Sequence, residues 1–201
     1  MINILIIKLA MSNTCWVVYI MSIFEIDVKK NKPDHLSQIY FGMGCFWGAE
    51  RRFWNLDGLY TTVVGYAGGH TNDPNYEKVC TGTTGHAEVV KVIYDEKKNN
   101  LNDLLKIFWE SHNPTQLNRQ GNDIGTQYRS IILTEHLNQI NELQISKEKF
   151  QKLLTAKSLG TIHTEIKIIK NFYVAEDYHQ KYLHKNPDGY CGLKGLEVSY
   201  A

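Results

Sequence analysis

The sequence predicts an α+β fold, a two-layer sandwich in which helices pack on one face of a mixed β-sheet. A length of 201 residues, 43% of them hydrophobic, describes one globular domain with a sizeable core. From about Ser37, strand-like and helix-like segments alternate at short intervals, without internal repeats or low-complexity linkers. Their order, β-α-β-β-α-β, predicts a ferredoxin-like core.

The first 24 residues differ in composition from the rest of the chain. Residues 1–11 and 16–24 are largely apolar and are separated by a short polar segment. A membrane span needs about 20 largely unbroken apolar residues, and a secretory signal needs a basic start and a small-residue cleavage site. We therefore expect an N-terminal extension over residues 1–37, with an apolar leader at 1–24 that is outside the fold. One hypothesis is that translation begins at Met21.

Short β-prone runs predict strands at residues 38–41, 61–66, 87–94, 129–133 and 164–169. Apolar residues at helical spacing predict helices at residues 46–55, 101–111 and 135–156. Beyond about residue 172 the sequence is loop-rich, and Pro187-Asp188-Gly189 marks a turn. We assign residues 38–201 to one catalytic domain that ends in this tail.

The charges argue against a nucleic-acid partner. The formal net charge is +1, and charged residues are interspersed, as in Lys147, Glu148 and Lys149. A phosphate-binding surface needs clustered basic residues. Gly42 and Gly44 follow a predicted strand, but the next glycine is one residue too far along for the Gly-x-Gly-x-x-Gly pattern, so we expect no dinucleotide.

The four cysteines are too scattered for a disulfide scaffold, and no pair has Cys-x-x-Cys spacing: Cys15, Cys45, Cys80 and Cys191. Only Cys80 and His86 lie close together, without the paired spacing of zinc ligands. We therefore expect no metal and no other cofactor. Free thiols without a persuasive export signal favour the cytoplasm, and we expect a monomer with no membrane association.

Cys45 lies where the predicted strand 38–41 meets the predicted helix 46–55. Free amide N–H groups and the helix dipole at such a junction favour an anion, so we expect a lowered pKa and a populated thiolate. A free cysteine is more often a small buried hydrophobe. This position alone leaves both interpretations open.

The segment Gly44-Cys45-Phe46-Trp47-Gly48 resembles the active-site signature of the A-type peptide methionine sulfoxide reductases. Further blocks that are similar to this family follow in order, at residues 68–76, 80–88, 108–115, 120–130, 175–180 and 189–191. The resemblance covers roughly residues 39–192. It implies an oxidoreductase that uses thiols to reduce methionine S-sulfoxide, free or in oxidised proteins and peptides, and so repairs oxidative damage.

Reduction of a sulfoxide requires a soft nucleophile and a pocket for the methyl group. As a thiolate, Cys45 would attack the sulfur, releasing methionine and leaving a sulfenic acid on Cys45. Phe46 and Trp47 would pack around the methyl group, since thioethers sit well against aromatic rings. Core packing is the alternative interpretation of this aromatic pair.

The reaction also needs a proton donor for the oxygen. Glu88 lies in an apolar strand-like run, and burial in a dry cleft would raise its pKa and keep it protonated. The resemblance implies that Glu88 is the catalytic acid and that Tyr76 and Tyr128 donate hydroxyl hydrogen bonds to the same oxygen. It also matches Asp123 to an aspartate that we expect to order the substrate-binding loop and its water.

A second thiol must then clear the sulfenic acid. Cys191, in a tail that glycine and turn residues make flexible, is the candidate, and the resemblance implies that thioredoxin reduces the resulting Cys45–Cys191 disulfide. Many relatives carry another recycling cysteine beyond this point, where Ser199 stands in this chain. We therefore predict a two-cysteine cycle, with Cys80 and Cys15 as bystanders.

Two other function classes remain open from the residues alone. A cysteine hydrolase or acyltransferase would need His86 or His179 beside Cys45 as a base. A lone histidine is more often structural, so we assign neither a catalytic role. A non-catalytic module could instead bind peptides in the aromatic groove around Trp47, and Cys45→Ser would then leave its function intact.

Overall fold

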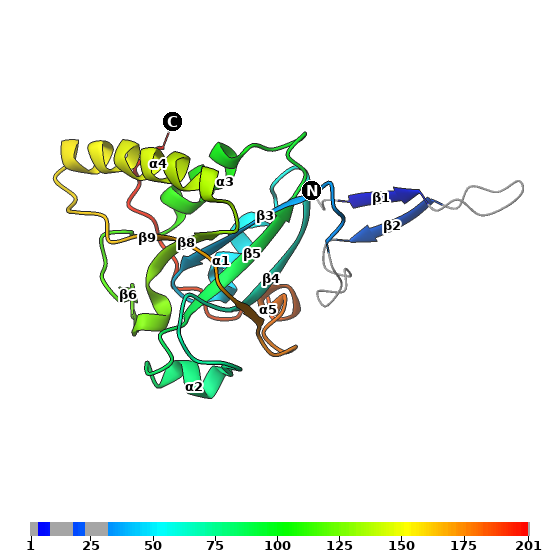
Figure 1. Ribbon diagram of the computed structural model, residues 1–201, viewed down its shortest axis with the longest axis horizontal. Helices are drawn as coiled ribbons and strands as arrows, with labels where there is room; N and C mark the ends of the chain where they lie inside the picture. The colour runs from blue at the N-terminus through cyan, green and yellow to red at the C-terminus, as the bar shows by residue number, and fades with distance from the viewer. Residues whose placement is uncertain (1–3, 9–17, 23–31, 201) are drawn as a thin grey trace, which may run out of the picture.

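The computed structural model describes residues 4–8, 18–22 and 32–200 (Figure 1). Strands β1 (Ile4–Lys8) and β2 (Val18–Ser22) pair antiparallel in a two-stranded sheet of their own. Figure 1 shows this pair at one side of the six-stranded sheet. The sequence analysis placed no strand here. The remainder of the expected leader lies outside the described residues, and the start of translation at Met21 stays a hypothesis.

A six-stranded sheet, in the order β10-β4-β5-β3-β8-β9, forms the centre of the domain. Its strands are β3 (Ser37–Met43), β4 (Leu59–Ala67), β5 (Ala87–Tyr94), β8 (Ser130–Thr134), β9 (Glu165–Ile168) and β10 (Phe172–Val174). All neighbouring strands are antiparallel except β8 and β9, which are parallel. The central order β4-β5-β3-β8 is that of a ferredoxin-like unit, so the predicted α+β fold with a mixed sheet is confirmed.

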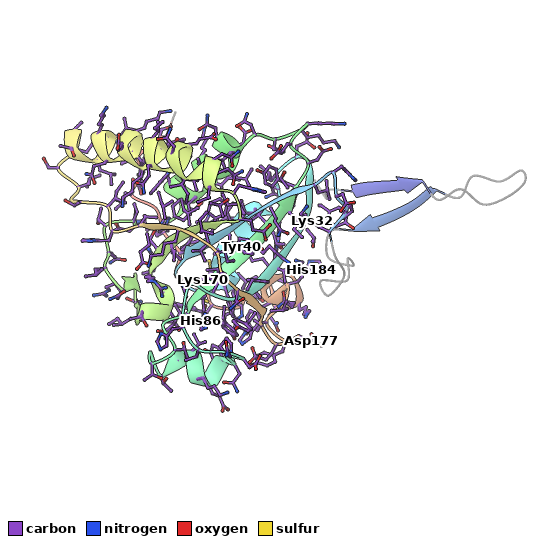
Figure 2. The ribbon with its side chains drawn as sticks, viewed as in Figure 1. Lys32, Tyr40, His86, Lys170, Asp177 and His184 are labelled. Atoms are coloured by element: carbon purple, nitrogen blue, oxygen red, sulfur yellow. The ribbon has the colours of Figure 1, made fainter. Side chains whose placement is uncertain are left out.

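The long helices are α1 (Phe46–Phe53), α3 (Leu101–Ser111) and α4 (Leu137–Ala156), close to their predicted bounds. They cover one face of the sheet, where alternate side chains of β3 point inward and the rings of Phe41 and Phe53 stack 5.3 Å apart. Figure 2 shows side chains filling the space between the sheet and helices α3 and α4. Burial of this face explains why the helical periodicity was readable from the sequence.

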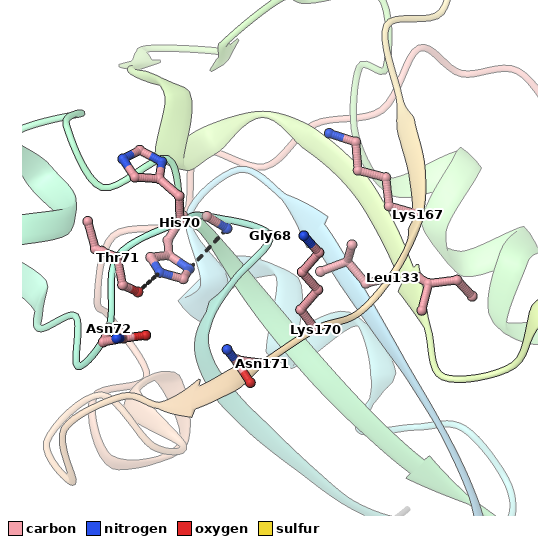
Figure 3. A pocket seen from close by; sticks show the side chains of 11 residues that line it. Gly68, His70, Thr71, Asn72, Leu133, Lys167, Lys170 and Asn171 are labelled. Carbon is pink, nitrogen blue, oxygen red and sulfur yellow. Dashed lines mark hydrogen bonds between the residues drawn. The ribbon is translucent and has the colours of Figure 1, made fainter.

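The opposite face of the sheet is covered by the segment that joins β9 to β10. Residues 169–171 run from β9 at one edge to β10 at the other, and so short a segment spans at most roughly 14 Å. The two edges therefore approach each other and the sheet curls. Phe172 fills the concave side, with its ring 5.3 Å from that of Tyr40 and beneath the Lys91 ammonium. A cavity of about 380 Å³, lined in part by Lys167 and Lys170, opens beside the crossing segment (Figure 3).

Short elements complete the domain: α2 (Tyr76–Cys80), β6 (Arg119–Gln120), β7 (Asp123–Ile124), the 3-10 turn η1 (Thr126–Tyr128) and α5 (Tyr182–Lys185). None of these short elements was predicted from the sequence, and β10 and α5 lie in the tail that was expected to be loop-rich. The tail is also more firmly packed than expected, because the side chains of Leu193, Val198 and Tyr200 are buried.

Candidate active site

Cys45 occupies the N-cap position of α1, directly after β3. The turn between the two elements passes through Gly44, whose φ of 99° lies in the left-handed region that side chains disfavour. A Cβ on Gly44 would also lie 2.7 Å from the side chain of Gln120. The glycine therefore allows the chain to turn tightly and present the thiol of Cys45 at the start of the helix, as the sequence predicted.

Glu88 projects from β5 to the same helix terminus. Its side chain is 2% exposed, and its Oε2 accepts a hydrogen bond of 3.0 Å from the backbone N–H of Phe46. Burial raises the pKa of Glu88 to about 8, with the charge of Asp123 adding to the rise and the Phe46 N–H opposing it. The carboxyl group is therefore protonated at neutral pH, in the state that a general acid requires.

The pKa of Cys45 is raised, which corrects the expectation of a lowered value. Burial is the largest cause and the negative charge of Glu88 the next, and together they outweigh the stabilising N–H groups of Trp47 and Gly48. The helix terminus acts as predicted, but desolvation is stronger. Protonation of Glu88 removes one of the two main obstacles to forming the thiolate.

Tyr76, the first residue of α2, and Tyr128, the last residue of η1, face this pair from two separate loops. Burial raises the pKa of both phenols. At Tyr76 the hydrogen bond and the charge of Cys80 add to the rise, followed by the charges of Glu88 and Cys45; at Tyr128 the charge of Glu88 is the next cause after burial. These electrostatic effects indicate that both phenols lie close to Glu88 and Cys45. Because both phenols stay protonated at neutral pH, both can donate hydrogen bonds there.

The aromatic residues after Cys45 take different positions. Phe46 is buried, with its ring 5.9 Å from that of Tyr66 and 5.0 Å from that of His179. Trp47 is partly exposed, stacks on Tyr182 at a centroid distance of 3.9 Å, and donates its indole N–H to His179 Nδ1 at 3.0 Å. Trp47 thus presents an open aromatic surface, whereas Phe46 also belongs to the core.

Asp123 lies on β7 and accepts a hydrogen bond of 3.2 Å from the hydroxyl of Tyr190. Its charge raises the pKa of both Cys45 and Glu88, so it belongs to the same group of side chains. Burial raises its own pKa, and the Tyr190 hydroxyl opposes this. This hydrogen bond joins β7 to Tyr190, the residue just before Cys191.

Cys191 lies against the first turn of α1. Its Sγ is 3.0 Å from the point that a Cβ of Gly48 would occupy, one helical turn from Cys45. Both cysteines are free thiols and partly exposed. Beyond Cys191 the tail is held by Arg52, which donates to the carbonyl of Leu193 at 3.0 Å. The resolving candidate therefore lies against the same helical turn that Cys45 caps.

The two histidines proposed as alternative bases have other partners. His86 Nδ1 accepts from the N–H of Gly69 at 3.1 Å, and its Nε2 lies 2.8 Å from the carbonyl of Thr71. His179 accepts from Trp47. Both ring nitrogens of His86 and the Nδ1 of His179 are therefore engaged, and the Nε2 of His179 lies 3.7 Å from Glu176 Oε2, so these contacts do not favour a hydrolase that directs either histidine at Cys45.

Three residues near the site were not singled out by the sequence analysis: Glu176, Tyr182 and Tyr190. Glu176 accepts from the N–H of Tyr76, Tyr182 stacks on Trp47, and Tyr190 bonds Asp123. In the sequence, Glu176 and Tyr190 lie in the family-like blocks at residues 175–180 and 189–191, and Tyr182 lies just after the first of these blocks. Periodicity could not have identified them because they lie in the irregular tail.

Residues 32–200 and the two short N-terminal strands contain no group of three His, Cys, Asp or Glu side chains arranged to hold a metal ion. No helix within the same ranges combines the length and apolar character of a membrane span.

Known proteins resemble this chain in sequence and in structure. The family model "Peptide methionine sulfoxide reductase" matches residues 37–198. Peptide methionine sulfoxide reductase MsrA of Brucella suis is 57% identical over 167 residues, which cover 83% of this chain and 77% of the relative. Methionine sulfoxide reductase A of Corynebacterium diphtheriae matches with a TM-score of 0.76 and 46% identity over 79% of each chain.

Solved structures of Mxr1 from Saccharomyces cerevisiae also match this chain. Its reduced form has a TM-score of 0.72 and 39% identity, covering 81% of this chain and 92% of Mxr1. Its complex with Trx2 has a TM-score of 0.54 and 26% identity, covering 84% and 95%. With the family model and the close relatives, these matches show that the chain belongs to the peptide methionine sulfoxide reductase family, as an oxidoreductase of the MsrA type that reduces methionine sulfoxide.

Proposed function

We propose that Cys45 is the nucleophile and Glu88 the proton donor in the reduction of methionine S-sulfoxide. Cys45 Sγ attacks the sulfoxide sulfur, the oxygen passes to Sγ, and the proton lost by the thiol is balanced by the proton that Glu88 delivers to the oxygen. Methionine leaves with its sulfur reduced by two electrons, and Cys45 remains as a sulfenic acid. The observation that carries this proposal is the 3.0 Å hydrogen bond from the N–H of Phe46 to Glu88 Oε2, which fixes the acid beside the nucleophile.

The surrounding residues hold the sulfoxide in a defined orientation. Tyr76 and Tyr128 donate hydroxyl hydrogen bonds to the oxygen, while the methyl group packs against Trp47 and the edge of Phe46. Asp123 holds the loop that closes the site on the side of Tyr190. The raised pKa values of the phenols support this role, because each phenol keeps the proton that it donates.

Cys191 then resolves the intermediate. Its thiol attacks the Cys45 sulfenic acid, forming a Cys45–Cys191 disulfide and releasing water. Thioredoxin supplies two electrons through its dithiol and returns both cysteines to thiols; support comes from the yeast relative Mxr1, whose structure has been determined in complex with Trx2. Ser199 stands where many relatives have a further cysteine, and its hydroxyl donates to Glu110 at 3.3 Å, so we infer a cycle of two cysteines.

The proposal is tested by incubating the reduced protein with each epimer of methionine sulfoxide in the absence of reductant. We expect one equivalent of methionine from the S epimer, together with a Cys45–Cys191 disulfide identified by peptide mapping. Methionine formation by Cys45→Ser, or a disulfide that joins Cys45 to Cys80 instead, would contradict the assignment. A hydrolase would yield neither methionine nor a disulfide.

A further inference from the structure

The turn formed by residues 176–179 contacts Tyr76 at two points. Glu176 Oε1 accepts the backbone N–H of Tyr76 at 2.8 Å. The ring of His179 lies 4.8 Å from the ring of Tyr76. The turn itself is closed by the N–H of His179, which donates to the carbonyl of Glu176 at 2.9 Å. One short segment of the tail thus holds both the backbone and the ring of Tyr76.

The second oxygen of Glu176 is also engaged. Oε2 accepts the hydroxyl of Tyr66 at 2.8 Å, and Tyr66 is buried on β4 beside Phe46. The carboxylate is therefore fixed to the sheet on one side and to α2 on the other. Burial alone would raise the pKa of Glu176, but its hydrogen bonds, led by that of the Tyr76 N–H, outweigh burial and lower it. Glu176 consequently stays ionised and acts as an acceptor of both bonds.

Helix α2 depends on such an external contact. It spans only Tyr76–Cys80, and a helix this short cannot pair its first N–H groups internally. Asn75 accepts from the N–H of Lys78 at 2.9 Å, and Glu176 accepts from the N–H of Tyr76. The direction of the Tyr76 side chain follows from where its backbone is held.

We propose that Glu176 is a positioning residue for Tyr76: by holding the start of α2, it places the Tyr76 hydroxyl where the sulfoxide oxygen binds. Glu176 itself touches neither the sulfoxide nor Cys45. This inference rests on the proposed function of Tyr76 as a donor to that oxygen. A glutamine at position 176 has one oxygen for two donors, so either Tyr76 or Tyr66 would face its NH₂ group and be displaced.

The test compares two routes to the same disulfide. Methionine sulfoxide oxidises Cys45 through the substrate pocket, whereas hydrogen peroxide oxidises the Cys45 thiol to the sulfenic acid directly, with release of water. Both routes then continue to the Cys45–Cys191 disulfide. Glu176→Gln should lower the second-order rate constant for methionine formation roughly 10- to 100-fold, the scale expected for a misplaced group, and leave the peroxide route unchanged.

A matched control is Glu135→Gln. Glu135 also accepts a tyrosine hydroxyl, that of Tyr40 at 2.8 Å, but on the opposite face of the sheet, so neither route should change. Tyr76→Phe provides the second measurement: in that background Glu176→Gln should cost much less than it does in the wild type, because the hydroxyl that it positions is gone.

Three results would overturn the inference. They are an unchanged sulfoxide rate in Glu176→Gln, an equal loss by the peroxide route, and full additivity with Tyr76→Phe. Each can occur while the wild-type protein still forms methionine and the Cys45–Cys191 disulfide, so the inference can fail while the proposed function stands. If the wild-type protein forms no methionine, the proposed function fails first.

Discussion

The carboxyl group of Glu88 is bonded at 3.0 Å to the backbone N–H of Phe46, the residue that follows Cys45. Strand β5 and helix α1 therefore place an acid and a thiol at a single point. The charge of Glu88 raises the pKa of Cys45, whereas burial keeps Glu88 largely protonated at neutral pH.

Glu88→Gln should slow methionine formation by roughly 100-fold or more, a common effect of losing a general acid. In the wild type, the rate at saturating sulfoxide should fall as the pH rises through about 8, where Glu88 loses its proton. The variant should lack this fall. Single-turnover measurements of methionine at pH values below and above about 8 would show both effects, and full activity in the variant would reassign the proton donor.

The same substitution should make Cys45 easier to ionise. Glu88→Gln removes a negative charge that raises the pKa of the thiol, so the pKa seen in the pH dependence of iodoacetamide alkylation should decrease. Peptide mapping separates alkylation of Cys45 from that of Cys80 and Cys191. An unchanged or higher pKa of Cys45 in the variant would show that Glu88 does not act on the thiol through its charge.

Glu88→Gln should lower activity but raise the stability of the fold at pH 8. The unfolded chain releases this proton near pH 4.5 and the folded protein near pH 8, so between these values the folded state binds more protons and its stability falls as the pH rises. Glu88→Gln removes that loss and keeps an acceptor for Phe46. Urea denaturation should therefore find the variant more stable than the wild type at pH 8 but not at pH 4; a variant that is less stable at pH 8 would contradict the burial argument.

Cys191→Ser should permit one round of methionine formation and block recycling by thioredoxin, because the Cys45 sulfenic acid then has no resolving thiol. Cys80→Ser is the matched control, since it removes an exposed thiol at the end of α2 while the serine hydroxyl can keep the hydrogen bond that Cys80 makes with Tyr76, and turnover should persist. Equal multiple turnover by Cys191→Ser and the wild type with thioredoxin would remove Cys191 from the cycle.

The sequence predicted the long elements well because their patterns are local. Strands β3, β4, β5 and β8 and helices α1, α3 and α4 supply most of the buried core residues, so apolar periodicity records them. Helix α5 is an element that such local patterns could not predict. It follows Lys181, whose backbone has a φ of 54° and whose ammonium is buried against Glu50 at 2.9 Å. A contact between residues so far apart in the chain leaves no periodic signal.

The site divides in the same way. The place of Cys45 between a strand and a helix made it a candidate nucleophile but left a structural role open until the family resemblance was added, whereas Tyr76, Tyr128 and Asp123 were recognised only through that resemblance. The direction of the Cys45 pKa was wrong because the local argument included the helix terminus but not burial or the charge of Glu88. Glu88 lies on β5, which the fold brings beside α1.

A substitution at Gly48 should distinguish the two steps of the proposed cycle, methionine formation and disulfide formation. A methyl group at this position would lie 3.0 Å from Cys191 Sγ and 3.3 Å from Leu193 Cβ, so Gly48→Ala should push the tail away from Cys45. Alanine favours the helical conformation of α1, and the fold should therefore be retained. Methionine formation in a single turnover should persist, while the Cys45–Cys191 disulfide forms more slowly and the sulfenic acid accumulates as an adduct with dimedone. Normal disulfide formation in this variant would mean that Cys191 reaches Cys45 by a route that does not pass Gly48.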